Sequence, residues 1–407
     1  MLEIIHSAFD LAAACAQQAR WACPPNPAVG CVIVAADGQV LAQGYTQPRG
    51  QAHGEVMALR DAQARGVSVQ GATVYVTLEP CSHHGRTPPC SLALVSARVA
   101  KVVVATLDPN PLVAGRGVQM LRSAGIEVEV LPQDSPPARA ALELNLGFFS
   151  RMLHQVPWVR MKIAASVDGQ TALPNGQSQW ITGAAARADG HAWRARSCAV
   201  LTGIGTVLQD DPLLDVRLVD TPRQPHLVVV DSQLELPLDA KLWATLGKRA
   251  KPYGKFNLSK VAINSIAGRA ITVYAAVEND ARKQALEALG ATVVYLPEAQ
   301  AQPSAQGVAK HRAKVDLRAM VRDLALREIN EVHVEAGYKL NGSLLRAGVV
   351  DELLVYTAPK LLGPGMGMAQ LPQLAELDSA IQLDFASADL LGPDLRLLAR
   401  LRGRSLL

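Results

Sequence analysis

No apolar run in the 407-residue sequence reaches about 18 residues, the length that a membrane-spanning helix needs. Residues 1–20 carry Glu3 and Asp10 and have no signal-peptide layout. No dense lysine and arginine tract occurs, and a formal charge of only +4 argues against a protein that coats nucleic acid. The sequence also has no internal repeat. We therefore expect a cytoplasmic protein whose partners are neither membranes nor nucleic acids.

Cysteine is scarce as well, and its use indicates reduced thiols rather than a disulfide framework. The chain has six cysteines, no export signal and 49% hydrophobic residues, which suffice for a core without disulfides. The length and a charged content of 19% predict a globular protein with two domains. Most of the cysteines lie in apolar surroundings and are expected in the core, namely Cys15, Cys23, Cys31 and Cys198. Only Cys81 and Cys90 have other candidate ligands near them.

The stretch from His53 to Cys90 carries the residue types of a hydrolytic zinc site. Cys81 follows a Leu-Glu-Pro sequence, and Cys90 comes after a loop of eight residues. Two thiolates and a neutral imidazole leave one tetrahedral position of zinc open for a water, whose pKa falls to about 7. Glu55 is two residues from His53, so we expect it to shuttle protons rather than to bind zinc. His-x-Glu followed by Pro-Cys and another Cys is the signature of zinc nucleobase deaminases.

The first part of the chain alternates helix and strand patterns, which predicts a mixed sheet covered by helices. The two candidate cysteine ligands are expected at or just before helix starts, where free N–H groups favour thiolate. Ser135-Pro136-Pro137 introduces a long helix that stops before Pro157, and we predict a domain boundary there, with domains 1–148 and 149–407. The expected helices are 4–20, 53–64, 116–124 and 138–153, and the expected strands are 28–34, 39–44, 72–78, 101–106 and 126–131.

The second part repeats an α/β pattern and contains two weak phosphate-binding signals. Gly337 follows a strand and precedes a helix, and Gly203-Ile204-Gly205-Thr206 follows another strand. Such turns let backbone N–H groups approach a phosphate, but they also serve simple packing. Residues 247–268 and 298–312 are predicted to be surface loops. The expected strands are 157–164, 198–203, 226–231, 270–276, 291–296, 331–335 and 351–357, and the expected helices are 184–196, 280–289, 316–328 and one from about 339.

Several motifs together resemble the bifunctional riboflavin-biosynthesis deaminase–reductase family. The first half contributes Glu-Pro-Cys-Ser-His-His-Gly-Arg-Thr-Pro-Pro-Cys at 79–90 and Pro-Asn-Pro-Ala-Val-Gly at 25–30. The second half contributes segments 162–169, 178–182, 206–217, 230–232 and 335–345 in the family's order. The resemblance covers nearly the whole chain. It implies an α/β protein with an N-terminal cytidine-deaminase-like α/β/α zinc domain and a C-terminal dihydrofolate-reductase-like α/β domain.

The resemblance also implies site residues for zinc and NADPH and for a pyrimidine ribosyl phosphate. The zinc ligands are His53, Cys81 and Cys90, and Glu55 is catalytic. The cofactor contacts are Ala164, Trp180, Thr206, Asp210, Ser232, Gly337, Tyr338, Lys339, Leu340, Asn341, Gly342 and Ser343. The substrate contacts of the second domain are Ser178, Arg194, Leu214, Arg217 and Glu335, and those of the first are Asn26, His83 and Arg86.

The implied reactions are a deamination followed by a reduction. The first acts on 2,5-diamino-6-ribosylamino-4(3H)-pyrimidinone 5′-phosphate, with Glu55 passing protons from water to the ring nitrogen and the departing amine. The second uses NADPH to reduce the ribosyl group of the deaminated product to ribityl. Asp210 and Lys162 are candidates for the proton donor of that step. We expect a homo-oligomer, either a dimer or a tetramer.

Two departures from the family pattern and three alternatives remain open at this stage. Thr46 replaces a histidine, so we leave position 46 out of the site, and Gly54 replaces an alanine without changing the ligand spacing. His84 could instead be a fourth ligand that closes a structural zinc site. A deaminase of free cytosine, cytidine or tRNA adenosine is the nearest rival enzyme. A non-catalytic nucleic-acid-binding module is the rival from another class and predicts salt-sensitive binding.

Overall fold

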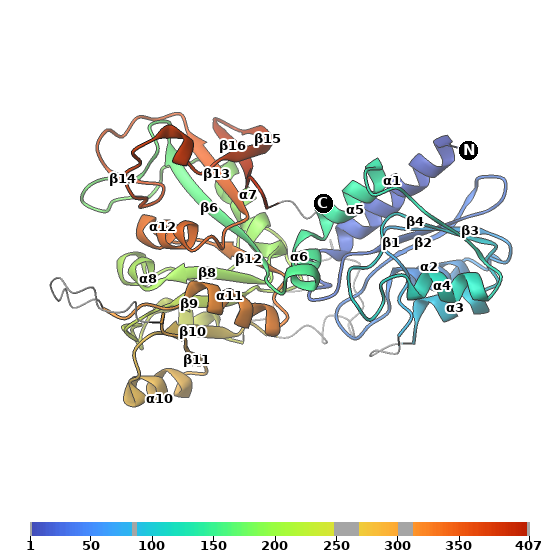
Figure 1. Ribbon diagram of the computed structural model, residues 1–407, viewed down its shortest axis with the longest axis horizontal. Coiled ribbons are helices and arrows are strands. Elements are labelled where there is room, and N and C mark those ends of the chain that lie inside the picture. The colour runs from blue at the N-terminus through green and yellow to red at the C-terminus, as the bar shows by residue number, and fades with distance from the viewer. Residues whose placement is uncertain (1, 84–87, 248–267, 300–311, 405–407) are drawn as a thin grey trace. The chain divides into compact units, whose positions relative to one another are not determined.

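The computed structural model describes residues 2–83, 88–247, 268–299 and 312–404 (Figure 1). Its contacts divide the described chain into two compact units, one that runs through Gln155 and one that begins at Val156. The domain boundary predicted between 148 and 149 falls inside a helix of the first unit, Leu146–His154. Both long loops predicted from the sequence, 247–268 and 298–312, lie mainly outside the described residues.

The first unit contains eleven elements, and its sheet has the order β2-β1-β3-β4-β5. Strand β1 pairs antiparallel with β2 and β3, whereas β3, β4 and β5 are parallel. The elements are α1 (Leu2–Ala19), β1 (Gly30–Val34), β2 (Val40–Tyr45), α2 (Gly54–Ala64), β3 (Thr73–Val76), α3 (Cys90–Ser96), β4 (Lys101–Val104), α4 (Arg116–Ser123), β5 (Glu127–Val130), α5 (Pro136–Leu144) and α6 (Leu146–His154).

Helices cover both faces of this sheet, as the α/β/α prediction requires. Helices α1 and α5 lie on one face and α2, α3 and α4 on the other (Figure 1). Because Val32 and Val34 of β1 point to the same face, they pack with Phe9 of α1 in one apolar core. The Phe9 and Tyr75 rings meet edge to face, with their centroids 5.6 Å apart.

The helix predicted over 138–153 is wrong in one respect, because Asn145 divides it into α5 and α6. The Asn145 side chain accepts a hydrogen bond from the backbone N–H of Ala28 at 2.7 Å and donates to the Ala28 carbonyl at 3.0 Å. Its backbone adopts φ −120° and ψ 21°, which is not helical. The buried Asn145 side chain therefore holds the segment that precedes β1, and the helix is interrupted at this residue.

The second unit is built on a sheet of nine strands in the order β11-β10-β9-β8-β12-β6-β13-β16-β15. Its elements are β6 (Trp158–Ser166), β7 (Gln170–Ala172), α7 (Ala184–Arg196), β8 (Ala199–Gly203), α8 (Ile204–Asp210), β9 (His226–Val230), η1 (Lys241–Thr245), β10 (Ile271–Ala275), α10 (Asp280–Ala288), β11 (Thr292–Tyr295), α11 (Leu317–Leu326), β12 (Glu331–Val334), α12 (Tyr338–Arg346), β13 (Glu352–Ala358), β14 (Met366–Gly367), η2 (Leu377–Ser379), β15 (Leu383–Leu391) and β16 (Asp394–Leu401).

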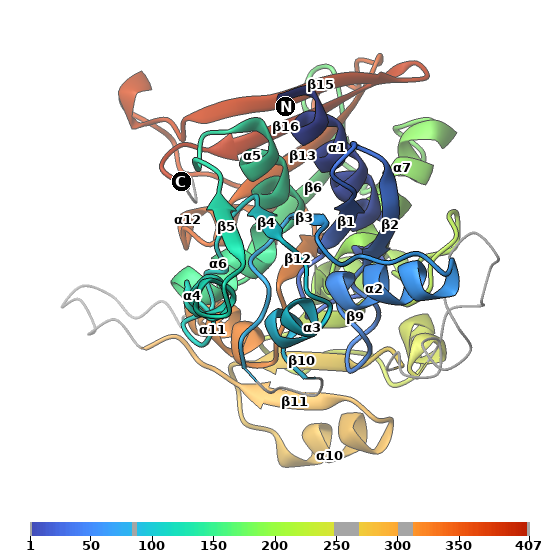
Figure 2. The ribbon, with the colours of Figure 1, turned by 90° about the vertical axis from the view of Figure 1, so that its right-hand side faces the viewer.

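The seven strands from β11 to β13 run parallel. At one edge, β16 pairs antiparallel with β13, and β15 pairs antiparallel with β16. Figure 2 shows β9, β10 and β11 leading to the opposite edge, with α10 beyond them. Neighbouring residues of one strand enter different cores: Val228 packs with α11 and α12, whereas Val229 packs with α10. A parallel sheet buried on both faces explains the continuous apolar runs of these strands.

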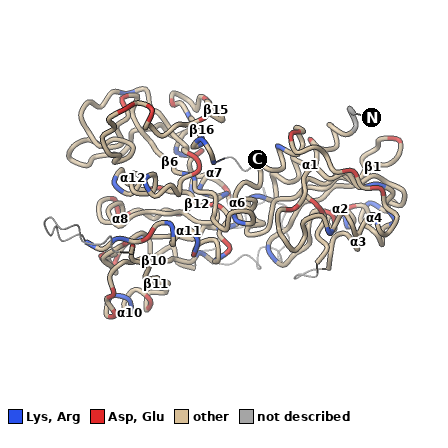
Figure 3. The backbone as a smooth tube through the Cα atoms, in the orientation of Figure 1, with Lys and Arg blue, Asp and Glu red and all other residues tan. Residues whose placement is uncertain are grey.

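The strands and helices predicted for the second unit are confirmed, but the pattern does not predict β7, α8, β14 or the β15–β16 hairpin. Strand β15 is mostly exposed, so it lacks the apolar alternation that identifies a half-buried strand. Among the described residues, no helix is both long enough and apolar enough to cross a membrane. Lysine and arginine are interspersed with aspartate and glutamate along both units (Figure 3).

Candidate functional site

His53, Cys81 and Cys90 converge in the first unit, from the starts of α2 and α3 and from the loop that precedes α3. The His53 Nδ1 atom lies 3.6 Å from the Cys81 sulfur and 3.4 Å from the Cys90 sulfur. The candidate ligand atoms all lie within 4.8 Å of one another, which is close enough to share one metal ion. Within the described part of the chain, which omits 84–87, the group contains only these three residues. His84 and Arg86 lie outside that part.

Local backbone structure explains this convergence. His53 is the N-cap of α2, and Cys90 is the first residue of α3. The Cys90 N–H donates to the Cys81 sulfur at 3.3 Å, as expected for a thiolate at a helix start. The prediction that both cysteines adjoin helix starts is wrong for Cys81, because Ser82 and His83 are not helical. A Cβ atom at Gly54 would lie 2.9 Å from the Val29 carbonyl oxygen, so alanine is disfavoured here.

The electrostatics of the cluster suit a soft divalent cation. Hydrogen bonds from Cys90 and His53 hold the pKa of the Cys81 thiol well below its usual range, despite burial. The hydrogen bond with Cys81, followed by burial, raises the pKa of Cys90, and a bound cation would deprotonate that thiol. Imidazole and thiolates are the ligands that zinc prefers. The donor set therefore fits zinc.

Glu55 lies in the first turn of α2, beside the three ligands. Its side chain is buried, and burial together with the Cys81 charge raises its pKa to about 7. A carboxyl group with a pKa near neutrality can both accept and donate a proton. This placement agrees in kind with the predicted proton shuttle.

The other sequence candidates in this unit have different surroundings. His83 and Asn26 are partly exposed, and the buried His83 Nδ1 atom has no hydrogen-bond partner among the described residues. The Thr46 hydroxyl accepts a hydrogen bond from Val29 N–H at 3.2 Å and is buried. The Thr46 hydroxyl therefore bonds the backbone of the neighbouring segment, and position 46 was left out of the predicted site.

Sequence reasoning missed the role of Glu79, which lies two residues before Cys81. Its buried carboxylate accepts four backbone hydrogen bonds, from Asp108 at 3.2 Å, Gly115 and Gly117 at 2.9 Å, and Val118 at 3.1 Å. These bonds hold the start of α4 beside the cysteine segment. Burial raises the pKa of Asp108 to about 7, and Asp108 is close enough for its charge to affect His53 and Cys81. The available signal for Glu79 was an acidic residue directly after an apolar strand segment and two residues before a candidate ligand.

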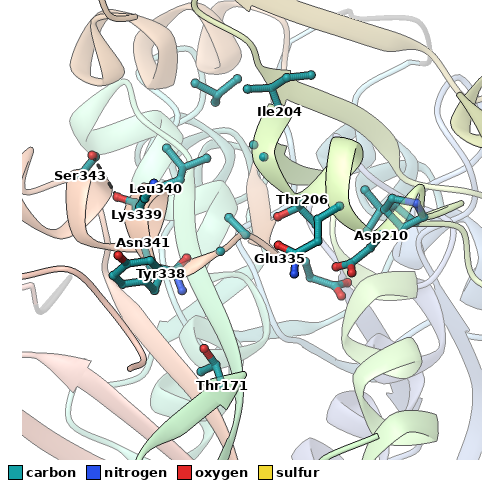
Figure 4. Close-up of a pocket in the computed structure, with 18 of the residues that line it drawn as sticks. Thr171, Ile204, Thr206, Asp210, Glu335, Tyr338, Lys339, Leu340, Asn341 and Ser343 are labelled. Atoms are coloured by element: carbon teal, nitrogen blue, oxygen red, sulfur yellow. Dashed lines mark hydrogen bonds between the residues drawn. The ribbon is translucent and has the colours of Figure 1, made fainter. Parts of the chain in front are cut away.

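A large pocket, with a volume of about 1530 Å³, lies at the carboxyl ends of β6, β8, β9 and β12 in the second unit. Ligands of parallel α/β sheets bind at this edge. All predicted cofactor contacts except Gly342 line the pocket, and so do Ser178, Arg194, Leu214, Arg217 and Glu335. Gly342 instead packs against the backbone of Gln370. Figure 4 shows Thr206, Asp210 and Glu335 on one side and the start of α12 on the other.

The start of α12 and the exposed Trp180 supply two different kinds of surface to the pocket. Gly337 is the N-cap of α12, so the unpaired N–H groups of the first turn are available to a phosphate. The Trp180 side chain is 62% exposed, and the Arg187 guanidinium lies 4.7 Å from the centre of its ring. Both surfaces suit a dinucleotide, which carries phosphates and flat aromatic groups.

Arg194 and Glu335 form a bidentate ion pair in this pocket. The two Arg194–Glu335 distances are 2.7 and 2.9 Å, and Arg194 also donates to the Asp215 carbonyl. Burial alone would raise the pKa of Glu335, but Arg194 holds it well below its usual range. Arg217 has a more accessible side chain, 47% exposed, and contacts Asp215 at 3.1 Å. Arg217 is therefore better placed than Arg194 to bind a substrate phosphate.

Lys162 and Asp210, the candidate proton donors, both line the pocket. Burial lowers the pKa of Lys162, although the nearby Glu335 opposes the shift. Burial raises the pKa of Asp210. Each shift brings the group closer to a pKa at which it could donate a proton near neutral pH. The choice between them stays open.

Two protein-family models match the chain, one in each half. Residues 157–397 match the RibD C-terminal domain, and residues 3–106 match the cytidine and deoxycytidylate deaminase zinc-binding region. Riboflavin biosynthesis protein RibD of Escherichia coli K12 is 41% identical over 380 residues, covering 93% of this chain and 94% of that protein. Its counterpart in Haemophilus influenzae is 39% identical over 404 residues, covering 96% and 94%.

Solved structures agree over the same length. Acinetobacter baumannii RibD has a TM-score of 0.80 and 37% identity, covering 98% of this chain and 99% of that one. A Thermotoga maritima protein, described as a diaminohydroxyphosphoribosylaminopyrimidine deaminase/5-amino-6-(5-phosphoribosylamino)uracil reductase, has a TM-score of 0.75 and 27% identity, covering 98% and 99%. With full-length relatives and both halves matched, this chain belongs to the RibD family of riboflavin biosynthesis proteins.

Proposed function

We propose that this chain catalyses two successive steps of riboflavin biosynthesis on one pyrimidine ribosyl phosphate. It is a bifunctional deaminase and reductase with zinc and NADPH as cofactors, as its family membership indicates. The first step is the hydrolytic deamination of 2,5-diamino-6-ribosylamino-4(3H)-pyrimidinone 5′-phosphate. The second is the reduction of 5-amino-6-(5-phosphoribosylamino)uracil, whose ribosyl group becomes ribityl. The convergence of His53, Cys81 and Cys90 beside Glu55 is the observation that carries the proposal.

In the deaminase step, His53, Cys81 and Cys90 hold the metal and Glu55 moves the protons. Zinc, when bound there, supplies a Lewis acid and lowers the pKa of a bound water to about 7. The Glu55 carboxylate accepts one proton of the attacking water and delivers it to the ring nitrogen. It then takes the proton of the new hydroxyl group on the ring carbon and delivers it to the amine, which leaves as ammonia as the carbonyl forms. Asn26, His83 and Arg86 are proposed to contact the substrate. The burial of Glu55 limits the loss of its proton to bulk water.

In the reductase step, the protein positions the reactants. NADPH, when bound, would supply the hydride that reduces C1′ of the ribosyl group, and Lys162 or Asp210 would supply the accompanying proton. We assign the phosphate to Arg217 and the sugar hydroxyls to Glu335, whose geometry Arg194 fixes. Ser178 and Leu214 complete the proposed substrate contacts. The cofactor is assigned to Ala164, Trp180, Thr206, Asp210, Ser232 and the residues at the start of α12 that line the pocket, Gly337–Asn341 and Ser343.

The boundary between the two catalytic domains and the oligomeric state are further proposals. We place the junction of the deaminase and reductase domains between residues 148 and 156, within or directly after α6. A homo-oligomer, either a dimer or a tetramer, would cover the exposed edge strand β15, where Phe385 is 73% and Leu390 is 77% exposed. Light scattering coupled to size exclusion tests this assembly. A cytoplasmic location is consistent with six free thiols.

Substrate choice provides the test of the proposed function. Ammonia release is measured with the pyrimidinone phosphate, cytidine and deoxycytidylate as substrates. We expect release only from the pyrimidinone phosphate, followed by NADPH oxidation once the deaminated product has formed. Release from cytidine at a comparable rate would instead favour a deaminase of free nucleosides.

A further inference from the structure

The segment from Asp211 to Arg217 connects α8 to the substrate end of the pocket and has no regular secondary structure. It supplies Leu214 and Arg217, two of the proposed substrate contacts. Asp211 and Leu214 have left-handed backbone conformations, with φ of 41° and 51°. Each such conformation costs a residue with a Cβ atom about 1–2 kcal/mol. Contacts from outside the segment must therefore fix its shape.

Side chains from distant parts of the sequence provide these contacts. Arg269, which lies just before β10, donates to the Leu213 carbonyl at 3.3 Å and to the Leu214 carbonyl at 2.8 Å. The Gln224 amide forms two bonds to the Val216 backbone, at 2.8 and 2.9 Å. The His191 Nδ1 atom accepts a hydrogen bond from the Arg217 N–H at 3.2 Å. The left-handed turn at Leu214 is thus held by Arg269.

Arg269 differs from the neighbouring arginines in its charge balance. It is 2% exposed, and no carboxylate among the described residues lies within ion-pair distance of it. Arg194 is paired with Glu335 and Arg217 with Asp215, so each of these two guanidinium groups has a carboxylate partner, whereas Arg269 has none among the described residues. Burial, followed by the charge of Arg194, lowers the pKa of Arg269 to about 10, so it remains charged at neutral pH.

We propose that Arg269 is a positioning residue for the phosphate group of the reductase substrate, an inference that depends on the proposed function. By fixing the Leu213 and Leu214 carbonyls it sets the backbone that carries Arg217, and its charge favours an anion at that end of the pocket. A phosphate monoester is the ligand class that gains from both effects, because it is doubly charged and binds guanidinium groups at fixed geometry. Arg269 does not line the pocket, so it acts through the segment.

The test compares Arg269→Met and Arg269→Lys with the wild-type enzyme on the deaminated substrate and on its phosphate-free nucleoside. We expect KM for the phosphorylated substrate to rise about tenfold or more in Arg269→Met, because a charged hydrogen-bond donor is lost. The rise should be smaller in Arg269→Lys, because lysine keeps the charge and can still donate hydrogen bonds. KM for the nucleoside and the affinity for NADPH should stay unchanged. Thermal melting shows which variants are folded. If Arg269→Met does not fold, KM of Arg269→Lys for the phosphorylated substrate tests the inference.

Arg282→Met is the matched control, because Arg282 also donates to two loop carbonyls, those of Leu234 at 3.0 Å and Leu236 at 2.5 Å. The Arg282→Met variant should prefer the phosphorylated substrate over the nucleoside to the same extent as the wild-type enzyme. Equal losses on both substrates in Arg269→Met would show a merely structural role and overturn the inference, as would an unchanged KM. If the wild-type enzyme does not oxidise NADPH with the phosphate, the proposed function itself fails.

Discussion

At the scale of single residues, Glu55 combines burial with a position beside three soft metal ligands. Its carboxylate is not among the proposed zinc ligands, because the side-chain donor atoms of His53, Cys81 and Cys90 lie close enough together to share one metal ion. The role left for it is proton transfer. Removing the acid–base function should therefore separate metal binding from turnover.

Glu55→Gln should keep zinc bound and slow ammonia release by about 10²- to 10⁴-fold, the usual contribution of a positioned acid–base group. The variant amide has nearly the same shape but cannot carry the proton. Metal analysis and an ammonia assay on the same preparation measure both effects, and NADPH oxidation with the deaminated substrate serves as the internal control. Near-normal ammonia release would exclude Glu55 as the shuttle.

His333 is fully buried on β12, and neither ring nitrogen has a hydrogen-bond partner among the described residues. Burial lowers the pKa of His333 to about 3; nearby Glu335 opposes this shift, whereas Arg194, Arg160 and Lys162 add to it. The imidazole is therefore neutral in the folded state, although its Nε2 atom lies 3.5 Å from Glu335. Because the unfolded state binds a proton near pH 6.5 and the folded state does not, stability falls as the pH drops below that value.

His333→Leu should remove this part of the pH dependence. Between pH 6.5 and pH 4, the wild-type enzyme should lose stability more steeply than the variant, by at most about 1.4 kcal/mol per pH unit. At pH 7.5 the two should be similar, because the substitution removes buried polar atoms that lack partners. Urea unfolding followed by tryptophan fluorescence reports mainly on the second unit, which contains Trp158, Trp180, Trp193 and Trp243. Identical slopes in the two proteins would contradict this account.

At the scale of elements, Glu79 links two parts of the chain that local sequence patterns treat separately. Its carboxylate, two residues before Cys81, holds the backbone at Asp108 and at the start of α4. Glu79→Gln would place an N–H₂ group against some of these N–H donors. We expect a loss of about 1–3 kcal/mol in stability of the first unit and reduced ammonia release, with the reductase activity retained.

Glu127→Gln is the control for this substitution, because it neutralises a carboxylate whose side chain is 68% exposed and pairs with Lys101 at 2.9 Å. An exposed ion pair contributes about 0–1 kcal/mol, so this variant should resemble the wild type. Urea unfolding and both activity assays measure the comparison. If Glu79→Gln is no more destabilised than Glu127→Gln, the four backbone contacts do not organise the site.

The same scale shows which features could be predicted from the sequence. Strands such as β8 and β9 are buried on both faces, and their continuous apolar runs identify them directly. His53, Cys81 and Cys90 were predictable because zinc chemistry restricts residue type and spacing. The break at Asn145 was not, since it depends on a partner at Ala28, 117 residues away. Arg269 was equally hidden, because its role appears only when Leu213 and Leu214 are placed beside it.

At the scale of the whole molecule, the two candidate sites lie in different compact units. The two activities should therefore be separable by substitution. Cys90→Ser should abolish ammonia release and leave NADPH oxidation with the deaminated substrate within about twofold of the wild type, since the three proposed zinc ligands lie in the first unit. Glu335→Gln should have the opposite effect, and an equimolar mixture of the two variants should restore the overall conversion. Loss of both activities in either variant would contradict this independence.

The most direct test of the central claim is the zinc content of the purified protein, measured by mass spectrometry together with ammonia release. We predict one zinc per chain in the wild-type enzyme and in Glu55→Gln, and none in His53→Ala, Cys81→Ala or Cys90→Ala, because each removes one of the three proposed ligands. Stoichiometric zinc in all three ligand variants, or an active enzyme without zinc, would contradict the account.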